Sequence, residues 1–405
     1  MPRFPAALFA ACVAMPALAA PPQSAHLTPI RTQDGLQRYL REMPIQDTPL
    51  APLPPASRKR FLAELAFRPH GIDINYGEAA AELTHPQIVQ LYALFGQVPP
   101  FDDMGLTPTQ QQRRKLERIE DARQRGFVPA QCPESEVERH FDQLSAAKPY
   151  FSMPDAQRFA AEKRDYDRLF GELFGAPDTL RNLGDPDLRL LVRALHSVLY
   201  AVPDIAHVAQ LQQVLDEMQR RGMTDDTDFE DLYTAEIGTR KFAEAATLRK
   251  KHPDMRVAAL PRFVPGHTPE YGLPTALSVD VGTDTMRRQT FDLGGPLHIV
   301  VVAGCHFSED AARAIEGDTQ LRLLFAQHSI WLAAPSQSIE DVSAWDRQFP
   351  DFPMHVAWNQ DEWSMLPSWA MPTYYVYRNG RLVKQFSGWL GTDRLKQSLR
   401  EARAL

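Results

Sequence analysis

The feature that most constrains the fold is a short apolar run at residues 297–303, which is followed directly by Gly304 and Cys305. Its β-branched residues are typical of a buried strand, and residues 309–316 have the spacing of a helix. The sequence therefore predicts a strand that delivers Cys305 to a turn at or near a helix N-terminus. The helix dipole and the free backbone N–H groups at such a place favour a thiolate over a thiol.

The alternation of strand and helix continues to the C-terminus. A β-hairpin is predicted at 277–281 and 289–293, followed by strands at 297–303, 329–333, 355–358, 373–378 and 381–386 and by helices at 309–316, 319–327, 339–348 and 392–404. Asn379-Gly380 is the dipeptide typical of a two-residue hairpin turn. A parallel beginning, an antiparallel end and flanking helices predict a small α/β sandwich over residues 275–405.

Residues 57–265 have helical signals instead, and we expect them to form a helical domain, either a bundle or a set of helical hairpins. Apolar residues recur on one face of each longer helix, and those faces are expected to bury against one another. The faces comprise Tyr166, Leu169, Phe170, Leu173, Phe174, Leu188, Leu191, Leu195, Val198, Leu199, Ile205, Val208, Leu211, Leu215 and Met218. Residues 228–253 resemble a single tetratricopeptide-like hairpin, and one unit does not make a repeat array. Residues 266–274 are predicted to be a linker.

The N-terminus has the parts of a secretory signal peptide, with Arg3 before an apolar run at 4–18 and small residues at 17–19. Residues 1–19 are therefore predicted to be a signal peptide, and the protein is expected to be exported to a bacterial periplasm or secreted. Residues 20–56 are a proline-rich lead with one helix near 33–42. Because no later segment is apolar enough to cross a bilayer, no membrane span is expected.

Charge and motif content exclude several classes of function. The formal net charge is −7, which does not favour nucleic acid as a partner. His298, His306, His328 and His355 all lie in the C-terminal third without paired metal-ligand spacing, so no metal or other cofactor is expected. Trp363 and Trp369 precede Pro372, where they are candidates to line a groove for a client protein.

Residues 275–405 resemble the thioredoxin family. The residues that carry the resemblance are Cys305 at a helix start, Met371-Pro372-Thr373 before a strand, the Asn379-Gly380 hairpin, and Gly388 before the last helix. The resemblance implies a cis peptide bond at Pro372, which would lie beside Cys305. It also implies that Met371 contacts an incoming client peptide, which adds as an extra strand. The fold class is thus α+β with two domains, an N-terminal all-α helical domain followed by a thioredoxin-like sandwich.

The sequence departs from the family pattern at three positions around Cys305. Ser308 replaces the second active cysteine, Gly304 replaces the usual tryptophan, and Ile299 replaces the acidic residue of the preceding strand. In the family this acid helps to deprotonate the second cysteine, so the loss of both is coherent. A serine hydroxyl cannot serve as a resolving thiol, because disulfide exchange requires a thiolate.

Three interpretations of Cys305 stay open on the sequence. In the first, Cys305 is a reactive monothiol, assisted by His306, that forms mixed disulfides with client proteins or a small thiol. An external thiol or Cys132 then releases Cys305 from the mixed disulfide. Alternatively, Cys305 and Cys132 form a structural disulfide. In the third, Cys305 is inert and the domain is a binding module, with a further partner for the helical domain. We favour the first, which would make the protein a thiol-disulfide oxidoreductase or isomerase if it is an enzyme.

Overall fold

The structure is a computed structural model that describes residues 29–68, 71–102, 104–146, 153, 155–176, 178–201, 203–266 and 272–405. The predicted signal peptide lies outside the described residues, as do residues 267–271 of the predicted linker. The chain divides into two compact units, Met1–Arg113 and Arg114–Leu405. No helix in the described ranges is both long enough and apolar enough to cross a membrane.

The first unit is mainly helical. Its elements are α1 (Gln33–Glu42), a 3₁₀ turn η1 (Ile45–Asp47), α2 (Pro55–Glu64), β1 (Ala66–Arg68), β2 (Gly71–Asp73), α3 (Gly77–Glu82) and α4 (His85–Ala93). Helix α1 occupies the predicted range, and the antiparallel β1–β2 pair was not predicted. Leu50 and Leu53 of the proline-rich lead are buried in the same core as Phe61 and Leu91. The lead is therefore an integral part of this unit.

The second unit begins with helices. They are α5 (Pro108–Gln124, which starts in the first unit), α6 (Glu136–Ser145), α7 (Asp155–Phe170), α8 (Asp185–Ala201), α9 (Ile205–Arg220), α10 (Glu230–Gly238) and α11 (Phe242–Lys251), with 3₁₀ turns η2 (Pro129–Gln131), η4 (Gly171–Phe174), η5 (Leu180–Asn182) and η6 (Asp226–Phe229). The predicted apolar faces are buried, except that Leu173 and Phe174 are partly buried and one residue is exposed. Ile205 is 61% exposed, because it is the first residue of α9.

The sheet of the second unit has eight strands. They are β3 (Arg262–Phe263), β4 (Thr275–Asp280), β5 (Thr285–Thr290), β6 (His298–Val302), β7 (Ser329–Ala333), β8 (Met354–Ala357), β9 (Thr373–Arg378) and β10 (Arg381–Ser387), in the order β10-β9-β6-β7-β8-β4-β5-β3. Strands β6, β7 and β8 are parallel, whereas β9, β10 and β4 each run antiparallel to a neighbour. The predicted fold class is confirmed, a helical region followed by a thioredoxin-like mixed sheet.

The predicted hairpin before β6 is present with a shifted second strand. β5 covers residues 285–290, whereas the sequence predicted 289–293. The Asp280 side chain accepts hydrogen bonds from the backbone N–H groups of Gly282 and Thr283, and Asp284 adopts a left-handed conformation with φ 49°. These interactions close the turn early, so the returning strand starts at Thr285.

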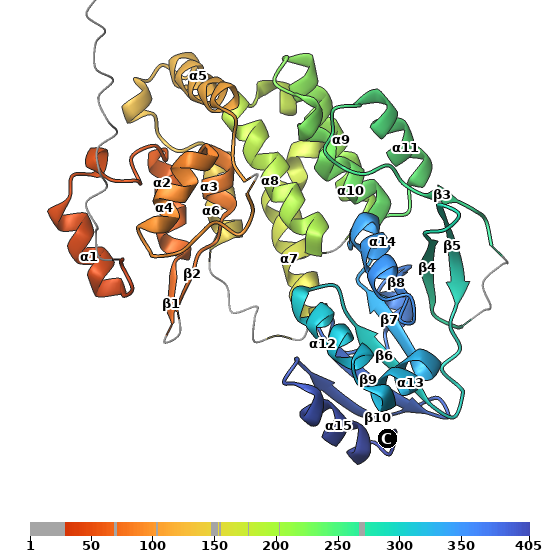
Figure 1. The fold of residues 1–405 in the computed structure, drawn as a ribbon. Coiled ribbons are helices and arrows are strands. Elements are labelled where there is room, and N and C mark those ends of the chain that lie inside the picture. Colours follow the sequence, from red (N-terminus) through yellow and green to blue (C-terminus); the bar gives the residue numbers. More distant parts are fainter. Residues whose placement is uncertain are drawn as a thin grey trace, which may run out of the picture. The chain divides into compact units, whose positions relative to one another are not determined.

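The two faces of the sheet are covered differently. Alternate residues such as Ile299 and Val301 face the large hydrophobic cluster, which includes side chains of α12 (His306–Glu316), α13 (Thr319–His328), α14 (Ile339–Gln348) and α15 (Thr392–Glu401). Figure 1 shows α12, α13 and α15 lying over the strands. The intervening residues, such as Val300 and Val302, face a smaller cluster around Trp363 of the 3₁₀ turn η7 (Asp361–Trp363).

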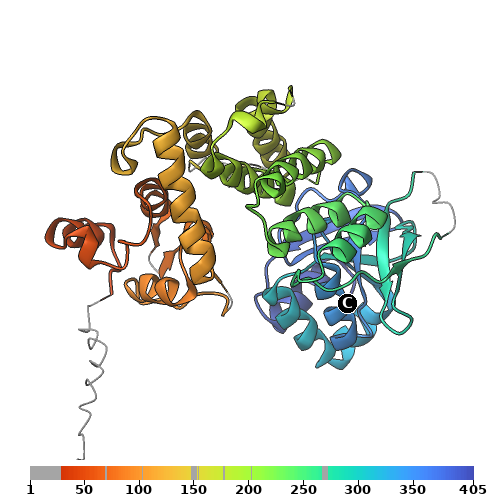
Figure 2. The ribbon, with the colours of Figure 1, turned by 90° about the horizontal axis from the view of Figure 1, so that it is seen from above.

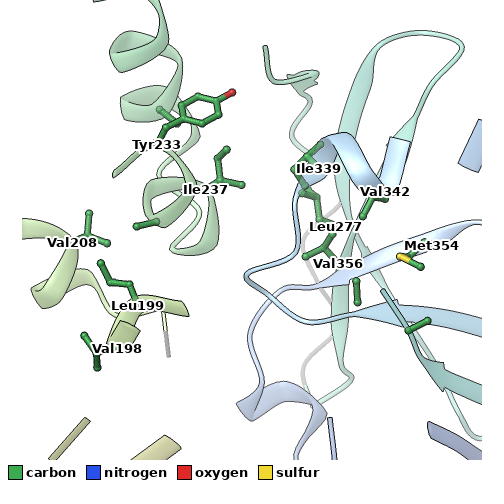
Figure 3. Packing of buried hydrophobic residues seen from close by; sticks show 14 of the residues in the cluster. Val198, Leu199, Val208, Tyr233, Ile237, Leu277, Ile339, Val342, Met354 and Val356 are labelled. Carbon is green, nitrogen blue, oxygen red and sulfur yellow. The ribbon is translucent and has the colours of Figure 1, made fainter. Parts of the chain in front are cut away.

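The helices of the second unit share one hydrophobic cluster with the sheet. Figure 3 shows Tyr233 and Ile237 of α10 on one side of this cluster, and Leu277, Ile339 and Val356 on the other. In Figures 1 and 2 the green helices α10 and α11 lie beside the sheet region. The sequence predicted separate helical and thioredoxin-like domains, whereas residues 114–405 form one compact unit.

Arg240, between α10 and α11, links these helices to the sheet. Its guanidinium donates to the carbonyls of Trp358 (3.0 Å) and Ala357 at the end of β8, and to the Ile237 carbonyl (3.1 Å) at the end of α10. Its ring partner is Trp358, at 5.5 Å from the guanidinium carbon to the ring centroid. The backbone of Arg240 is left-handed, with φ 65°, which holds the side chain in this position.

We predict that Arg240→Gly lowers the free energy of unfolding by about 2–4 kcal/mol, because buried carbonyls lose charge-assisted hydrogen bonds. Glycine accepts the positive φ, so the substitution adds no backbone strain. Urea denaturation would measure it. Arg403→Gly is the matched control, since Arg403 also has a positive φ (54°) and its side chain is exposed. Equal stabilities of the two variants would contradict the role of Arg240.

Candidate functional site

Cys305 is the N-cap residue of α12. Strand β6 ends at Val302, and Ala303 continues its pairing by donating to the Leu332 carbonyl (2.9 Å). Cys305 is extended (φ −124°, ψ 168°), and its carbonyl accepts from the N–H groups of Ser308 (2.8 Å) and Glu309 (3.2 Å). The helix thus begins at His306, three residues before its predicted start. The predicted position of the sulfur at a helix N-terminus is confirmed.

Two polar groups contact the half-buried sulfur. The Cys305 Sγ lies 3.4 Å from the Oγ of Ser308 and donates to the Met371 carbonyl at 3.6 Å. Ser308 is fully buried beneath the first turn of α12. The serine that replaces the second cysteine therefore touches the sulfur, and the sequence-predicted pair Cys305 and Met371 is brought together.

The Met371–Pro372 peptide bond is cis, as the resemblance implied. The Pro372 carbonyl accepts from the Gly388 N–H (2.7 Å), and Thr373 pairs with Val302 of β6. These bonds fix Met371 next to the end of β6. In the described part of the chain, the Met371 N–H has no hydrogen-bond partner, so it is available to an added strand.

A side chain at Gly304 would meet close neighbours and a backbone conformation that L residues rarely adopt. A Cβ on this residue would be 2.6 Å from Oε1 of Gln337 and 3.3 Å from Sδ of Met371, and φ is +138°. Gln337 follows β7 and donates from Nε2 to Asp341 Oδ2 (3.1 Å). A tryptophan at this position would require the Gln337 side chain to move, because Gln337 Oε1 lies where the Cβ would be. No sequence signal pointed to Gln337, which lies 33 positions away (337 − 304).

Three apolar side chains of the segments around Cys305, Pro372 and Gly388 are exposed. Phe307 is 51% exposed and Met371 is 37% exposed, and Leu390, two residues after Gly388, is 76% exposed. His306 is exposed and its ring contacts that of Phe307 (centroids 3.8 Å apart). In the described part of the chain, His306 makes no hydrogen bond to Cys305. Its predicted assistance to the Cys305 thiol is therefore not supported by a direct contact.

Two other sequence candidates lie in the core. Trp363 is fully buried and its Nε1 donates to the Thr275 carbonyl (2.9 Å). The prediction that Trp363 lines a client groove is therefore wrong. His355 hydrogen-bonds through Nδ1 with Ser278 (2.9 Å), and burial lowers its pKa to about 4. It is therefore a neutral structural histidine at pH 7.

Cys132 does not meet Cys305. It follows η2 as a half-buried residue, and both cysteines are free thiols. Within the described residues no bond joins their sulfurs, so the structural disulfide considered from the sequence is not present. A role for Cys132 in releasing a client from Cys305 stays a prediction.

The comparisons with known proteins concern the fold. No family model matches the sequence, and no curated protein matches it. Among solved structures, the chain is similar to an exposed lipoprotein thioredoxin from Streptococcus pneumoniae (16% identity, TM-score 0.24), with 31% of this chain and 98% of that chain covered. It is similar to a thioredoxin from Neisseria meningitidis at 15% identity, with 33% and 89% covered and a TM-score of 0.24. A thioredoxin-like protein from Bacteroides caccae is similar at 12% identity, with 67% of this chain and 95% of that chain covered and a TM-score of 0.23.

We predict that Gly304→Ala destabilises the protein by about 2–3 kcal/mol, since the Cβ meets Gln337 and the backbone has a positive φ. The free energy of unfolding in urea would measure the change. Gly317→Ala is the matched control at the end of α12, because a Cβ there has only ordinary contacts at 3.6 and 3.7 Å. If both variants are equally stable, Gly304 is not required by this packing.

Proposed function

We propose that this protein is a thiol-redox protein that uses Cys305 as a single active-site cysteine to form mixed disulfides with client proteins. The observation that carries the proposal is the half-buried Cys305 sulfur at the start of α12, beside the carbonyl that precedes the cis proline. A helix N-terminus favours a thiolate, which is the nucleophile of disulfide exchange. The structure itself establishes a thioredoxin-like fold, and the chemistry is our inference.

The proposed step is an exchange that needs no external oxidant. The Cys305 thiolate attacks one sulfur of a client disulfide, a new S–S bond forms, and the client S–S bond breaks. The second client sulfur leaves as a thiolate and takes a proton from solvent. One disulfide has replaced another, so the oxidation level is unchanged. The Ser308 hydroxyl at 3.4 Å cannot displace the client, because it forms no S–S bond. An external thiol must therefore attack the mixed disulfide to release it.

The proposed partner is an extended client segment beside Cys305. The free Met371 N–H offers the first hydrogen bond of an added strand. The exposed side chains of Phe307, Met371 and Leu390 would pack against apolar client residues. The proposal includes an exported location, where disulfides persist, on the basis of the predicted signal peptide. A further partner for the helical region is part of the same proposal.

A pure binding module is the second candidate, and Ser308 is the observation that favours it, because the site lacks a resolving thiol of its own. The two candidates differ in what Cys305 contributes. A binding module keeps its clients without a covalent bond, so its complexes survive reduction and the loss of the sulfur.

We predict that Cys305 in the native protein reacts with iodoacetamide about tenfold faster than Cys132, since only Cys305 lies at a helix N-terminus. Mass spectrometry of peptides after timed labelling would give both rates in one sample. Non-reducing gels of cell extracts should also show covalent client complexes, which disappear with reductant and with Cys305→Ala. The proposal is wrong if Cys305 is labelled only after denaturation, or if the covalent complexes persist in Cys305→Ala.

We predict that Ser308→Cys converts the site into one that releases its own adduct, because the substituted sulfur would occupy the place 3.4 Å from Cys305 Sγ. In a full chain carrying Cys12→Ser and Cys132→Ser, one equivalent of 5,5′-dithiobis(2-nitrobenzoate) should release about one thionitrobenzoate and leave a mass adduct. Addition of Ser308→Cys should raise the release to about two and remove the adduct.

Ser197→Cys on α8 is the control for this experiment, since it adds a thiol on an exposed helix position. It should keep the adduct on the protein. If Ser308→Cys also keeps its adduct, the geometry at the start of α12 does not support exchange.

A further inference from the structure

A pocket opens between helices α8, α9 and α10 and the loop that follows β7. Its empty volume is about 410 Å³ with the open mouth included, a size typical of ligand pockets. Every residue that lines it belongs to the second unit, so its walls are parts of one compact body. The pocket is therefore a feature of the same unit that carries Cys305.

The floor of this pocket is apolar and its mouth is polar. Leu211 at the floor is fully buried, and Leu199 and Ala235 beside it are less than a tenth exposed. His196 and Asp231 also line the pocket, and their side chains are 55% and 42% exposed. His196 Nδ1 lies 2.9 Å from Asp231 Oδ1, which joins α8 to α10 at the mouth. An apolar side chain that entered would remove the floor from water while this polar pair stayed hydrated.

The loop after β7 connects this pocket to the Cys305 site. Ser336 lines the pocket, and the next residue, Gln337, places its Oε1 2.6 Å from where a Cβ on Gly304 would be. The Sδ of Met371 is 3.3 Å from the same point. Through these contacts, covalent geometry limits the distance between the Cα atoms of Ser336 and Cys305 to at most about 16 Å, which an extended chain spans in about five residues.

We infer that this pocket binds an apolar side chain of the client segment whose disulfide reacts with Cys305. The inference rests on the proposed function and describes its partner more closely, as a segment with a leucine-like residue about five positions from its reactive cysteine. The Met371 backbone would hold the segment beside the sulfur, and the pocket would hold it a few residues further along. The helices α8, α9 and α10 would thereby take part in the selection of clients.

The position of the pocket favours a client side chain over a free small molecule. One leucine-sized group buries too little surface to pay the entropy of association by itself. It becomes effective when the same segment is held at a second point, because the second contact is then intramolecular. The neighbouring Cys305 site supplies that second point, since Ser336 and Gln337 are consecutive residues that face the pocket and Gly304 respectively.

The test measures how fast peptides form mixed disulfides with Cys305 in the full chain carrying Cys12→Ser and Cys132→Ser. Each peptide has one cysteine, present as its thionitrobenzoate disulfide, and one leucine placed roughly three to seven residues from it on either side. In the reference peptides an asparagine, which has a similar shape, replaces the leucine. Cys305 attacks the peptide sulfur and coloured thionitrobenzoate leaves, so its absorbance reports the rate. We expect the best leucine peptide to react about tenfold faster than its asparagine counterpart, since burial of a leucine favours binding by that order.

Thr234→Trp fills the pocket from the exposed side of α10. It should remove the advantage of the leucine peptide and leave the rate of the asparagine peptide unchanged. Thr247→Trp on α11 is the matched control, because both threonines are exposed and each hydroxyl donates to the carbonyl four residues earlier, at 3.0 and 2.8 Å. The control variant should keep the advantage.

The outcomes separate this inference from the proposed function. Equal rates for all leucine and asparagine peptides, or a leucine advantage that survives Thr234→Trp, would overturn the inference and leave the proposed function standing. If no peptide forms a mixed disulfide with Cys305, both are overturned.

Discussion

The buried guanidinium of Arg240 joins the helices of the second unit to its sheet. It donates to carbonyls at the end of α10 and at the carboxyl end of β8. Burial and the nearby Arg288 lower its pKa to about 10, which leaves it charged at neutral pH. Because β8 is parallel to β7 and β6, the helices are fixed near the same sheet edge from which β6 delivers Cys305.

The site at that edge is built from three chain segments that are far apart in sequence. β6 brings Gly304 and Cys305, the loop after β7 brings Gln337, and the cis peptide before β9 brings Met371. β9 runs antiparallel to β6, so its beginning meets the end of β6. The segments contact one another, since Gln337 Oε1 lies where a Cβ on residue 304 would be and the Met371 carbonyl accepts a hydrogen bond from the Cys305 thiol.

The local pattern predicted most of the sheet, and long-range contacts account for what it missed. β7 and α14 have the predicted ranges, and Met371–Pro372 is cis as the resemblance implied. The predicted start of α12 was too late, because the polar and aromatic residues 306–308 lack the apolar spacing that indicates a helix. Nothing near Gly304 in sequence indicates Gln337. Such features depend on packing between segments, which periodicity does not encode.

The three departures from the family pattern form one consistent arrangement around a single sulfur. An acid beneath α12 serves to deprotonate a second cysteine, and with Ser308 in that place the acid would only oppose negative charge on Cys305. Ile299, an apolar residue of the same face, removes this opposition. Gly304 leaves room for Gln337 rather than a tryptophan. Under the proposed function, such a site has no second thiol to displace a client from Cys305, so a thiol from outside the site would have to release the client.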